Sequence, residues 1–292
     1  MTRKRKFLTL VVVVSVLLLS AGLFAQQQKS LRVDVDLVMV NATVTDADNK
    51  LVTDLKPENF QIFEDKVEQK IRYFSTEEEP LSLGIVFDVS HSMESKIALA
   101  RDAAATFLDT GTPEDEYFLV EFSSRARVTE DFTTDVARLR DHLAFVPPQG
   151  ETAMYDAVYL AMSKVRKGQN PKKAILLITD GEDNHSRYSR GDIRRFARES
   201  DVQIFSIDLG RALIAELSDM TGGHSFRGKA SDLEDICSKI AQELKNQYVL
   251  GYASTNTNKD GKYRKVSIRV NPPAGLSRLH IRAKDGYYGP TG

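Results

Sequence analysis

Hydrophobic residues follow two different patterns along the chain, and these patterns divide it into three stretches. In residues 81–247, near-continuous apolar runs alternate with stretches in which apolar residues recur every three or four positions. The runs are typical of parallel strands buried on both faces, and the three-and-four spacing is typical of amphipathic helices. On either side, residues 31–78 and 248–288 contain shorter runs separated by polar turns, which predict further strands.

The middle stretch, residues 81–247, predicts an α/β fold: a doubly wound, mostly parallel sheet with helices on both faces, of the Rossmann-like type. The predicted strands are LSLGIVFDV (81–89), EYFLVEF (116–122), KKAILLITD (172–180) and VQIFSID (202–208), with a short edge strand in RARVTEDF (125–132). The predicted helices are Ile97–Leu108, Val136–Val146, Met154–Val165, Ile193–Glu199, Leu213–Met220 and Leu233–Leu244.

The two flanking stretches predict strands only. FQIFEDKVEQKIRYF (60–74) predicts two strands around a polar turn, and the C-terminal stretch predicts three strands, in YVLGYAS (248–254), YRKVSIRV (263–270) and LHIRAKDGYY (279–288). Neither flank has enough apolar surface to form a stable core alone. Our hypothesis is therefore that residues 31–78 and 248–288 pack together as one small β module.

The N-terminus predicts an exported protein. A basic stretch, TRKRK, is followed by the uncharged segment FLTLVVVVSVLLLSAGLFA, which ends at Ala25. This order predicts a secretory signal peptide over residues 1–25. The apolar segment also approaches the length of a membrane span, so an uncleaved N-terminal anchor is the alternative, and only then would the protein bind a membrane. In both cases we expect the remaining chain in the periplasm, at the cell surface or secreted.

Composition excludes several classes of function. The 40 basic and 41 acidic residues give a net charge of −1 and form no basic stripe, which argues against nucleic acid as a partner. The single cysteine, Cys237, excludes an intramolecular disulfide and a thiolate metal cluster. The chain has no G-x-G-x-x-G after its first strand, no P-loop and no nucleophile elbow, so we expect no small-molecule cofactor.

Small polar residues follow the predicted strands of the middle stretch. Asp88, Ser90 and Ser92 follow one strand, Thr152 stands at the start of a helix, and Asp180 ends another strand. In an open α/β sheet, ligands gather where the carboxyl ends of the strands meet. From the residues alone, three interpretations are open: the hydroxyls cap helices, they take part in catalysis, or they bind a metal ion.

The spacing of these residues resembles the metal-ion-dependent adhesion site of the von Willebrand factor type A domain family, which includes integrin I domains. The family motif is Asp-x-Ser-x-Ser, then a Thr, then an Asp at a later strand end. Here it is DVSHS (88–92), Thr152 in GETAMYDA and Asp180 in TDGED. The resemblance covers about residues 81–247, and the flanking strands resemble, more loosely, a bacterial exported subgroup related to these domains.

The resemblance implies a divalent ion, Mg²⁺ or Mn²⁺. It implies that Ser90, Ser92 and Thr152 are direct oxygen ligands and that Asp88 and Asp180 bind largely through water. Neutral hydroxyl ligands leave the charge of the ion poorly quenched, so that an Asp or Glu side chain of a protein partner can complete its coordination. The expected function is an exported binding module for adhesion or assembly of an envelope complex, without enzyme activity.

Two other functions are weighed against this expectation. A metal-dependent hydrolase or phosphotransferase could use carboxylates at a strand end, but the aspartate-nucleophile type would need a second Asp where Ser90 stands. In a structural domain, the ion would only stabilise the loops, and an open ligand position would argue against this reading. The tripeptide Arg190-Gly191-Asp192 is expected to begin a helix, with Asp192 in its first turn, rather than to serve as an integrin ligand.

Overall fold

The computed structural model describes residues 37–210, 214–228, 232–273, 275 and 278–292. The predicted signal peptide or anchor (1–25) and the first residues of the predicted N-terminal β segment lie outside these ranges. Within them, none of the helices is both long and apolar enough to cross a membrane.

A six-stranded sheet forms the centre of what we call the α/β part, from β5 to α7. The strand order is β10-β9-β8-β5-β6-β7, and every neighbouring pair is parallel except β6 with β7. The predicted mostly parallel α/β fold is therefore confirmed. The strands are β5 (Leu81–Asp88), β6 (Glu116–Phe122), β7 (Ala126–Thr133), β8 (Lys172–Thr179), β9 (Gln203–Asp208) and β10 (Ser225–Arg227).

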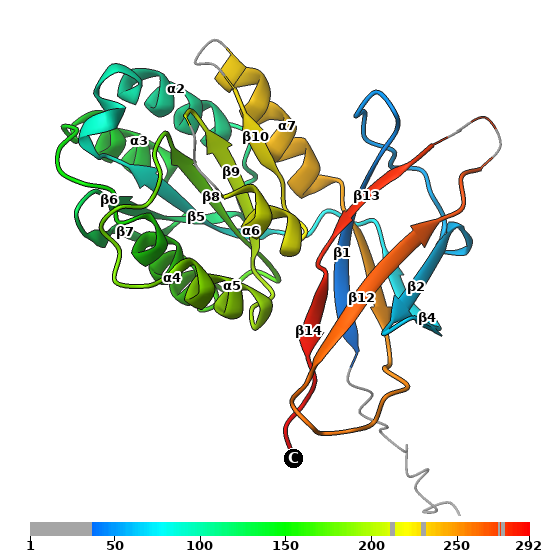
Figure 1. Cartoon of the computed structure of the whole chain (residues 1–292). Coiled ribbons are helices and arrows are strands. Elements are labelled where there is room, and N and C mark those ends of the chain that lie inside the picture. Colours follow the sequence, from blue (N-terminus) through cyan, green and yellow to red (C-terminus); the bar gives the residue numbers. More distant parts are fainter. Residues whose placement is uncertain (1–36, 211–213, 229–231, 274, 276–277) are drawn as a thin grey trace, which may run out of the picture. The chain divides into compact units, whose positions relative to one another are not determined.

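Helices cover both faces of this sheet (Figure 1). Residues of α2, α3 and α7 share one hydrophobic core with one face of the sheet, and residues of α4, α5 and α6 share a second core with the other face. All residues of β5 are buried, which explains its near-continuous apolar sequence. The helices are α2 (Ile97–Leu108), α3 (Val136–Ala144), α4 (Met154–Val165), α5 (Arg190–Arg198), α6 (Ala215–Met220) and α7 (Leu233–Lys245).

Most bounds in the α/β part agree with the predicted ones, and α5 shows why some differ. This helix begins three residues before the predicted Ile193, because Ser189 and Asp192 form a capping box in which Ser189 Oγ accepts a hydrogen bond from Asp192 N. Asp192 thus lies in the first turn of the helix, as predicted. Helix α3 ends at Ala144, two residues early, and the predicted start of α6 at Leu213 lies outside the described residues.

The two flanks of the chain form a pair of four-stranded antiparallel sheets, which we call the β part. The orders are β13-β1-β11-β4 and β14-β12-β2-β3. Each sheet contains strands from both flanks, because β1 pairs with β11 and β13, and β2 pairs with β12. The strands are β1 (Val38–Thr45), β2 (Phe60–Glu64), β3 (Val67–Gln69), β4 (Ile71–Ser75), β11 (Tyr248–Tyr252), β12 (Tyr263–Val270), β13 (His280–Ala283) and β14 (Gly286–Tyr288), and a short 3-10 helix, η1 (Pro57–Asn59), precedes β2. The domain boundaries given above stay predictions.

Two predictions in the β part were wrong in detail. The segment 60–74 forms three strands rather than two, because β4 leaves the sheet of β2 and β3 and pairs with β11. The segment 279–288 forms two strands in different sheets, β13 and β14. Between them Lys284 forms a bridge with Thr221, and Asp285 N donates a hydrogen bond to the carbonyl of Met220.

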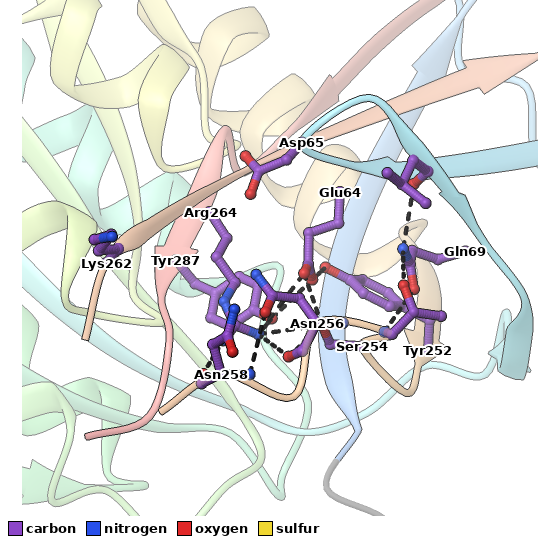
Figure 2. A network of polar contacts seen from close by, with 12 residues as sticks. Glu64, Asp65, Gln69, Tyr252, Ser254, Asn256, Asn258, Lys262, Arg264 and Tyr287 are labelled. Atoms are coloured by element: carbon purple, nitrogen blue, oxygen red, sulfur yellow. Dashed lines mark hydrogen bonds and ion pairs between the residues drawn. The ribbon is translucent and has the colours of Figure 1, made fainter. Parts of the chain in front are cut away.

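A buried carboxylate, Glu64, organises the interior of the β part (Figure 2). Its Oε2 accepts hydrogen bonds from the hydroxyls of Tyr252 (2.9 Å) and Tyr287 (2.8 Å), and its Oε1 accepts one from Ser254 Oγ (2.6 Å). Arg264 Nη1 lies 3.7 Å from Oε1. We call these five residues the Glu64 network. Both oxygens of Glu64 are thus satisfied by internal donors.

Candidate metal centre

Two central strands of the α/β part end beside aspartates at the same edge of the sheet. Strand β5 ends at Asp88, and β8 ends at Thr179, directly before Asp180. The strands are parallel neighbours, with Phe87 opposite Ile178, so their carboxyl ends meet. Asp88 is 0% exposed and Asp180 is 8% exposed. The sheet therefore holds two carboxylates largely away from solvent.

The turn after β5 places both predicted serines beside Asp88. Ser90 N donates a hydrogen bond of 2.8 Å to Asp88 Oδ1. The short 3-10 helix η2 (His91–Ser95) follows, and Met93 anchors it in the hydrophobic core. Ser90 is buried, whereas Ser92 is exposed to solvent. One serine is thus buried and the other borders solvent.

Side-chain oxygens form a connected series between the ends of β5 and β8. Ser90 Oγ lies 3.1 Å from Ser92 Oγ, and Ser92 Oγ donates a hydrogen bond of 2.7 Å to Asp180 Oδ1. Thr179 Oγ1 donates a hydrogen bond of 2.5 Å to Asp88 Oδ2. These contacts connect the two strand ends through side chains alone.

Thr152 reaches the same place from the loop before α4. Its N–H donates to Asn184 Oδ1 (2.9 Å), and its carbonyl accepts from Asn184 N (3.0 Å). A Cβ placed on Gly181 would lie 3.7 Å from both Thr152 Oγ1 and Ser92 Oγ, so both hydroxyls face this glycine. The structure thus brings all five predicted residues together, and we call this set the rim (Asp88, Ser90, Ser92, Thr152 and Asp180).

The hydroxyls of the rim do not cap the helices beside them. Neither η2 nor α2 has a side-chain hydrogen bond at its N-cap, which is Ser90 in η2 and Lys96 in α2. Helix α4 likewise has none, and its N-cap is Ala153 rather than Thr152. The capping interpretation is therefore wrong for these helices, and the three hydroxyls need another explanation.

The catalytic interpretation would pair a serine with a histidine, and no histidine contacts the rim hydroxyls in the described part of the chain. His91 is exposed, and the described contacts include no hydrogen bond from its ring to Ser90 or Ser92. His224 lies elsewhere, with Nδ1 3.0 Å from Glu243 Oε1. The one carboxylate that accepts from a rim serine, Asp180, is also paired with the ammonium of Lys96, which makes it a weaker base for a serine nucleophile.

Two residues outside the predicted set influence the charge of the rim. Lys96 Nζ lies 2.5 Å from Asp180 Oδ2, so its ammonium faces one of the two carboxylates. Thr179 donates to the other, Asp88. Burial raises the pKa of Asp88 above its ordinary value, and repulsion from Asp180 acts in the same direction, against the hydrogen bonds from Ser90 and Thr179. A charged Asp88 is therefore costly unless a cation lies near it.

The donor set of the rim fits a hard divalent cation. Its side chains offer only oxygens, the ligands that Mg²⁺ takes. Metal–oxygen bonds of about 2.1 Å in an octahedron place neighbouring oxygens about 3.0 Å apart. The Ser90–Ser92 and Ser92–Asp180 separations of 3.1 and 2.7 Å lie close to this. No group of three His, Cys, Asp or Glu residues suited to a metal occurs in the described ranges.

One protein-family model matches within the α/β part of the chain. Residues 83–182, which include the whole rim, match the family model described as von Willebrand factor type A domain. The UPF0353 protein of Mycolicibacterium paratuberculosis (strain ATCC BAA-968 / K-10) is 24% identical over 208 residues, covering 58% of this chain and 62% of that protein. The inter-alpha-trypsin inhibitor heavy chain H4 of Bos taurus is 24% identical over 200 residues, covering 60% of this chain and 22% of that protein. The similarity thus spans less than two thirds of either relative.

Solved structures agree on the fold. Proximal thread matrix protein 1 from the mussel byssus, in a structure described as having a zinc-occupied MIDAS motif, superposes with a TM-score of 0.51 at 20% identity. The similarity covers 62% of this chain and 49% of that chain. At this identity it shows a common fold and no more.

Proposed function

Because the central part of this chain belongs to the von Willebrand factor type A domain family, whose members are protein-interaction modules, we propose that the rim binds a protein partner through a divalent ion, Mg²⁺ or Mn²⁺. The observation that carries this proposal is the arrangement of the hydroxyls. Ser90 and Ser92 lie in contact with each other and beside two buried carboxylates, and no helix uses them as caps.

Each residue of the rim has a distinct role in this proposal. Ser90, Ser92 and Thr152 would hold the ion through neutral oxygens. Asp88 and Asp180 would orient its waters and supply negative charge. Neutral ligands leave the ion strongly electrophilic, and the bound ion would supply a coordination position for an Asp or Glu of the partner. Ser92 is exposed, so a partner side chain can reach this position.

The donor chemistry supports Mg²⁺ or Mn²⁺ as the resident ion. The mussel structure is described with zinc at its MIDAS motif. Structural and catalytic zinc sites are mostly built with imidazole nitrogen or thiolate sulfur. The five rim residues offer neither, which favours a harder ion in this chain.

A hydrolytic or phosphoryl-transfer function is disfavoured by the hydrogen bonds of Asp88. Its Oδ1 accepts from Ser90 N and its Oδ2 accepts from Thr179 Oγ1, and its side chain is fully buried. A nucleophilic carboxylate must reach the substrate, and Asp88 is held away from it. We therefore propose that the protein is not an enzyme.

We also propose that the protein acts outside the cytoplasm, in adhesion or in the assembly of an envelope complex. The support is the order of a basic stretch and an apolar segment before Ala25, which is the pattern of a signal peptide or an anchor. The partner would be a protein that presents an acidic side chain.

The test is a calorimetric titration of Mg²⁺ and Mn²⁺ into the purified chain and two single variants, Ser92→Ala and Ser95→Ala. Ser95 is a matched control, since it is exposed in the same short helix η2 and lies outside the rim. We expect saturable binding by the wild type and Ser95→Ala, and at least about tenfold weaker binding by Ser92→Ala. Adding acetate should strengthen ion binding by the wild type. Equal affinity in all three proteins, or no binding by the folded wild type even with acetate, would contradict the proposal.

A further inference from the structure

A groove of about 820 Å³ lies beside the rim, between helix α4, the start of β7 and the loop from β8 to α5. We call it the side groove, and its principal residues are Arg125, Asp156, Tyr159, His185, Arg187 and Tyr188. Ligand pockets in proteins have volumes of about 300–1,000 Å³. The groove is therefore large enough for one or two side chains of a bound peptide.

One backbone hydrogen bond connects the side groove to the rim, and a second bond reaches Glu151, the residue before Thr152. His185 N donates to the carbonyl of Thr152 (3.2 Å), and Ser124 Oγ, which also lines the groove, accepts from Glu151 N (2.9 Å). Tyr159 follows Thr152 by seven residues, nearly all helical, which corresponds to about 10 Å. An extended peptide covers this distance in about three residues.

Charge in the side groove is predominantly positive. Asp156 is the single acidic residue among the described groove residues, and it is already satisfied: Oδ1 accepts from the backbone N–H groups of Arg187 and Tyr188, and Oδ2 accepts from Arg187 Nε (3.2 Å). The Arg187 side chain is 89% exposed, which leaves its outer nitrogens accessible. Arg125 is exposed and has no ion pair within the described part of the chain. The groove thus presents two guanidinium groups to an incoming anion.

Two residues that line the side groove, Tyr159 and Tyr188, belong to a stack of three rings. The rings of Tyr159 and Tyr188 lie 4.1 Å apart at 18°, and those of Tyr159 and Phe196 lie 4.5 Å apart at 29°. Stacked aromatic side chains offer apolar contact area with little conformational freedom to lose. Such rings suit the residues of a peptide between two anchored side chains.

We propose that the side groove binds, through Arg125 and Arg187, a second carboxylate of the same partner segment whose first carboxylate reaches the rim. This inference rests on the proposed function, since the first carboxylate is the one at the ion. Guanidinium groups hold carboxylates through paired, charge-assisted hydrogen bonds, which a lysine cannot form. The side groove therefore selects acidic segments with two carboxylates over segments with one.

The test uses fluorescein-labelled peptides of glycine and serine with either one Glu or two Glu separated by two to five positions, measured by anisotropy with Mg²⁺. The proteins are the wild type, an Arg125→Ala/Arg187→Ala double variant, and Arg166→Ala. Arg166 is a matched control, because it is exposed at the opposite end of α4. For the wild type and Arg166→Ala, we expect the best two-Glu peptide to bind about tenfold more tightly than the one-Glu peptide, as one charge-assisted contact implies. The double variant should bind both peptides equally, with the affinity of the wild type for one Glu.

The outcomes separate the side groove from the rim. If one-Glu and two-Glu peptides bound the wild type equally at every spacing, or if the double variant kept the tenfold gain, the side groove would be refuted while Mg²⁺-dependent binding at the rim stood. If neither peptide bound in the presence of Mg²⁺, the proposed function would be refuted, and the side groove with it.

Discussion

The rim and the Glu64 network both place carboxylates in the interior beside hydroxyl groups, but the cations that face these carboxylates differ. Glu64 faces Arg264, whose side chain is 3% exposed. Asp180 faces Lys96, whose side chain is 34% exposed. Arg264 cannot leave without exposing the core of the β part, whereas Lys96 already borders water. The same kinds of chemical group, a carboxylate, hydroxyls and a cation, therefore make a permanent connection in one region and an exchangeable one in the other.

The hydroxyl groups show the same difference. In the Glu64 network, Tyr252, Ser254 and Tyr287 all donate to the carboxylate. In the rim, Ser92 Oγ donates to Asp180 but also lies within hydrogen-bond distance of Ser90 Oγ, and Ser92 is an exposed residue. A network in which every donor faces the carboxylate contributes to stability, and one in which hydroxyls share bonds keeps oxygens available for a ligand.

The largest expected effect follows from removing the charge of Glu64. A Glu64→Gln substitution leaves the guanidinium of Arg264 buried without a counter-charge, and we expect it to lower the free energy of unfolding by about 3–5 kcal/mol. Urea denaturation measures this. The exposed Glu68 is the control, and Glu68→Gln should change stability by less than about 0.5 kcal/mol. A loss of similar size in both variants would show that the Glu64 network is not a structural connection.

A smaller loss is expected from single hydroxyls, with a clear difference between the regions. Burial and the charge of Glu64 raise the pKa of Tyr252, so its hydroxyl stays a donor. Tyr252→Phe should cost about 1.5–3 kcal/mol, the range for a hydrogen bond to a charged group. Ser92→Ala should cost less than about 1 kcal/mol, although Ser92 Oγ also donates to a carboxylate, because Asp180 keeps its ion pair with Lys96 and water can replace the hydrogen bond from this exposed residue. Tyr73→Phe is the control, since Tyr73 is 39% exposed. Equal costs for Tyr252→Phe and Ser92→Ala would contradict the comparison.

Lys96 provides the next test, because it competes with the ion for Asp180. Once the ammonium of Lys96 is removed, we expect Mg²⁺ to bind up to about fivefold more tightly. The free energy of unfolding of the ion-free protein should fall by up to about 1 kcal/mol, the upper range for a partly exposed ion pair. Calorimetry and thermal unfolding of Lys96→Met measure the two effects. Lys167→Met is the control at an exposed position beyond α4. Weaker ion binding in Lys96→Met would instead indicate that the ammonium supports the site.

The smallest expected change in stability follows from removing the charge of Asp88. Unlike Glu64→Gln, this substitution should not destabilise the ion-free protein. In the folded state, burial raises the pKa of Asp88 above its ordinary 3.8. At pH values between the ordinary and the raised pKa, the folded state therefore binds more protons than the unfolded state. Stability in the absence of the ion therefore falls as pH rises through that window and stays lower above it. We expect Asp88→Asn to be at least as stable as the wild type at pH 7 in EDTA, and to lose the stabilisation by Mg²⁺.

Thermal unfolding between pH 4 and 8, with Mg²⁺ and with EDTA, checks this. Asp131→Asn is the control, because the pKa of that exposed carboxyl is lowered by Lys164 rather than raised. This variant should keep the full response to Mg²⁺. If Asp88→Asn were much less stable than the wild type in EDTA, Asp88 would have the same stabilising role in its region as Glu64 has in the β part.

The fold could be predicted where burial alone decides the structure. Strand β6 and helices α2 and α4 have the predicted bounds, since each has a clear apolar pattern. Strand β10 was not predicted, because Ser225–Arg227 is three residues long and has no such pattern. The break between β13 and β14 depends on contacts of Lys284 with Thr221, which lie far apart in the sequence. Local periodicity cannot show contacts of this kind.

The candidate site could be predicted to the extent that strand ends define it. The meeting of Asp88 and Asp180 follows from two parallel strands that end at one edge of the sheet. The contact of Lys96 with Asp180 depends on the direction of a long side chain at the start of α2, although its position four residues after Ser92 was visible. The role of Asn184 depends on a loop conformation that no periodic pattern describes.

The pairing of β1 has a consequence for how the chain folds during synthesis. Val38 pairs with Tyr252, and Thr45 pairs with His280, each more than 200 residues later. The α/β part is thus an insertion between strands that belong together, and it can complete its own sheet before they meet. Until the last strands leave the ribosome, β1 has unpaired edges and exposed apolar side chains, which makes the nascent protein prone to aggregation. In the cell, this chain should therefore depend on a holding chaperone until both flanks have reached the compartment in which the protein folds.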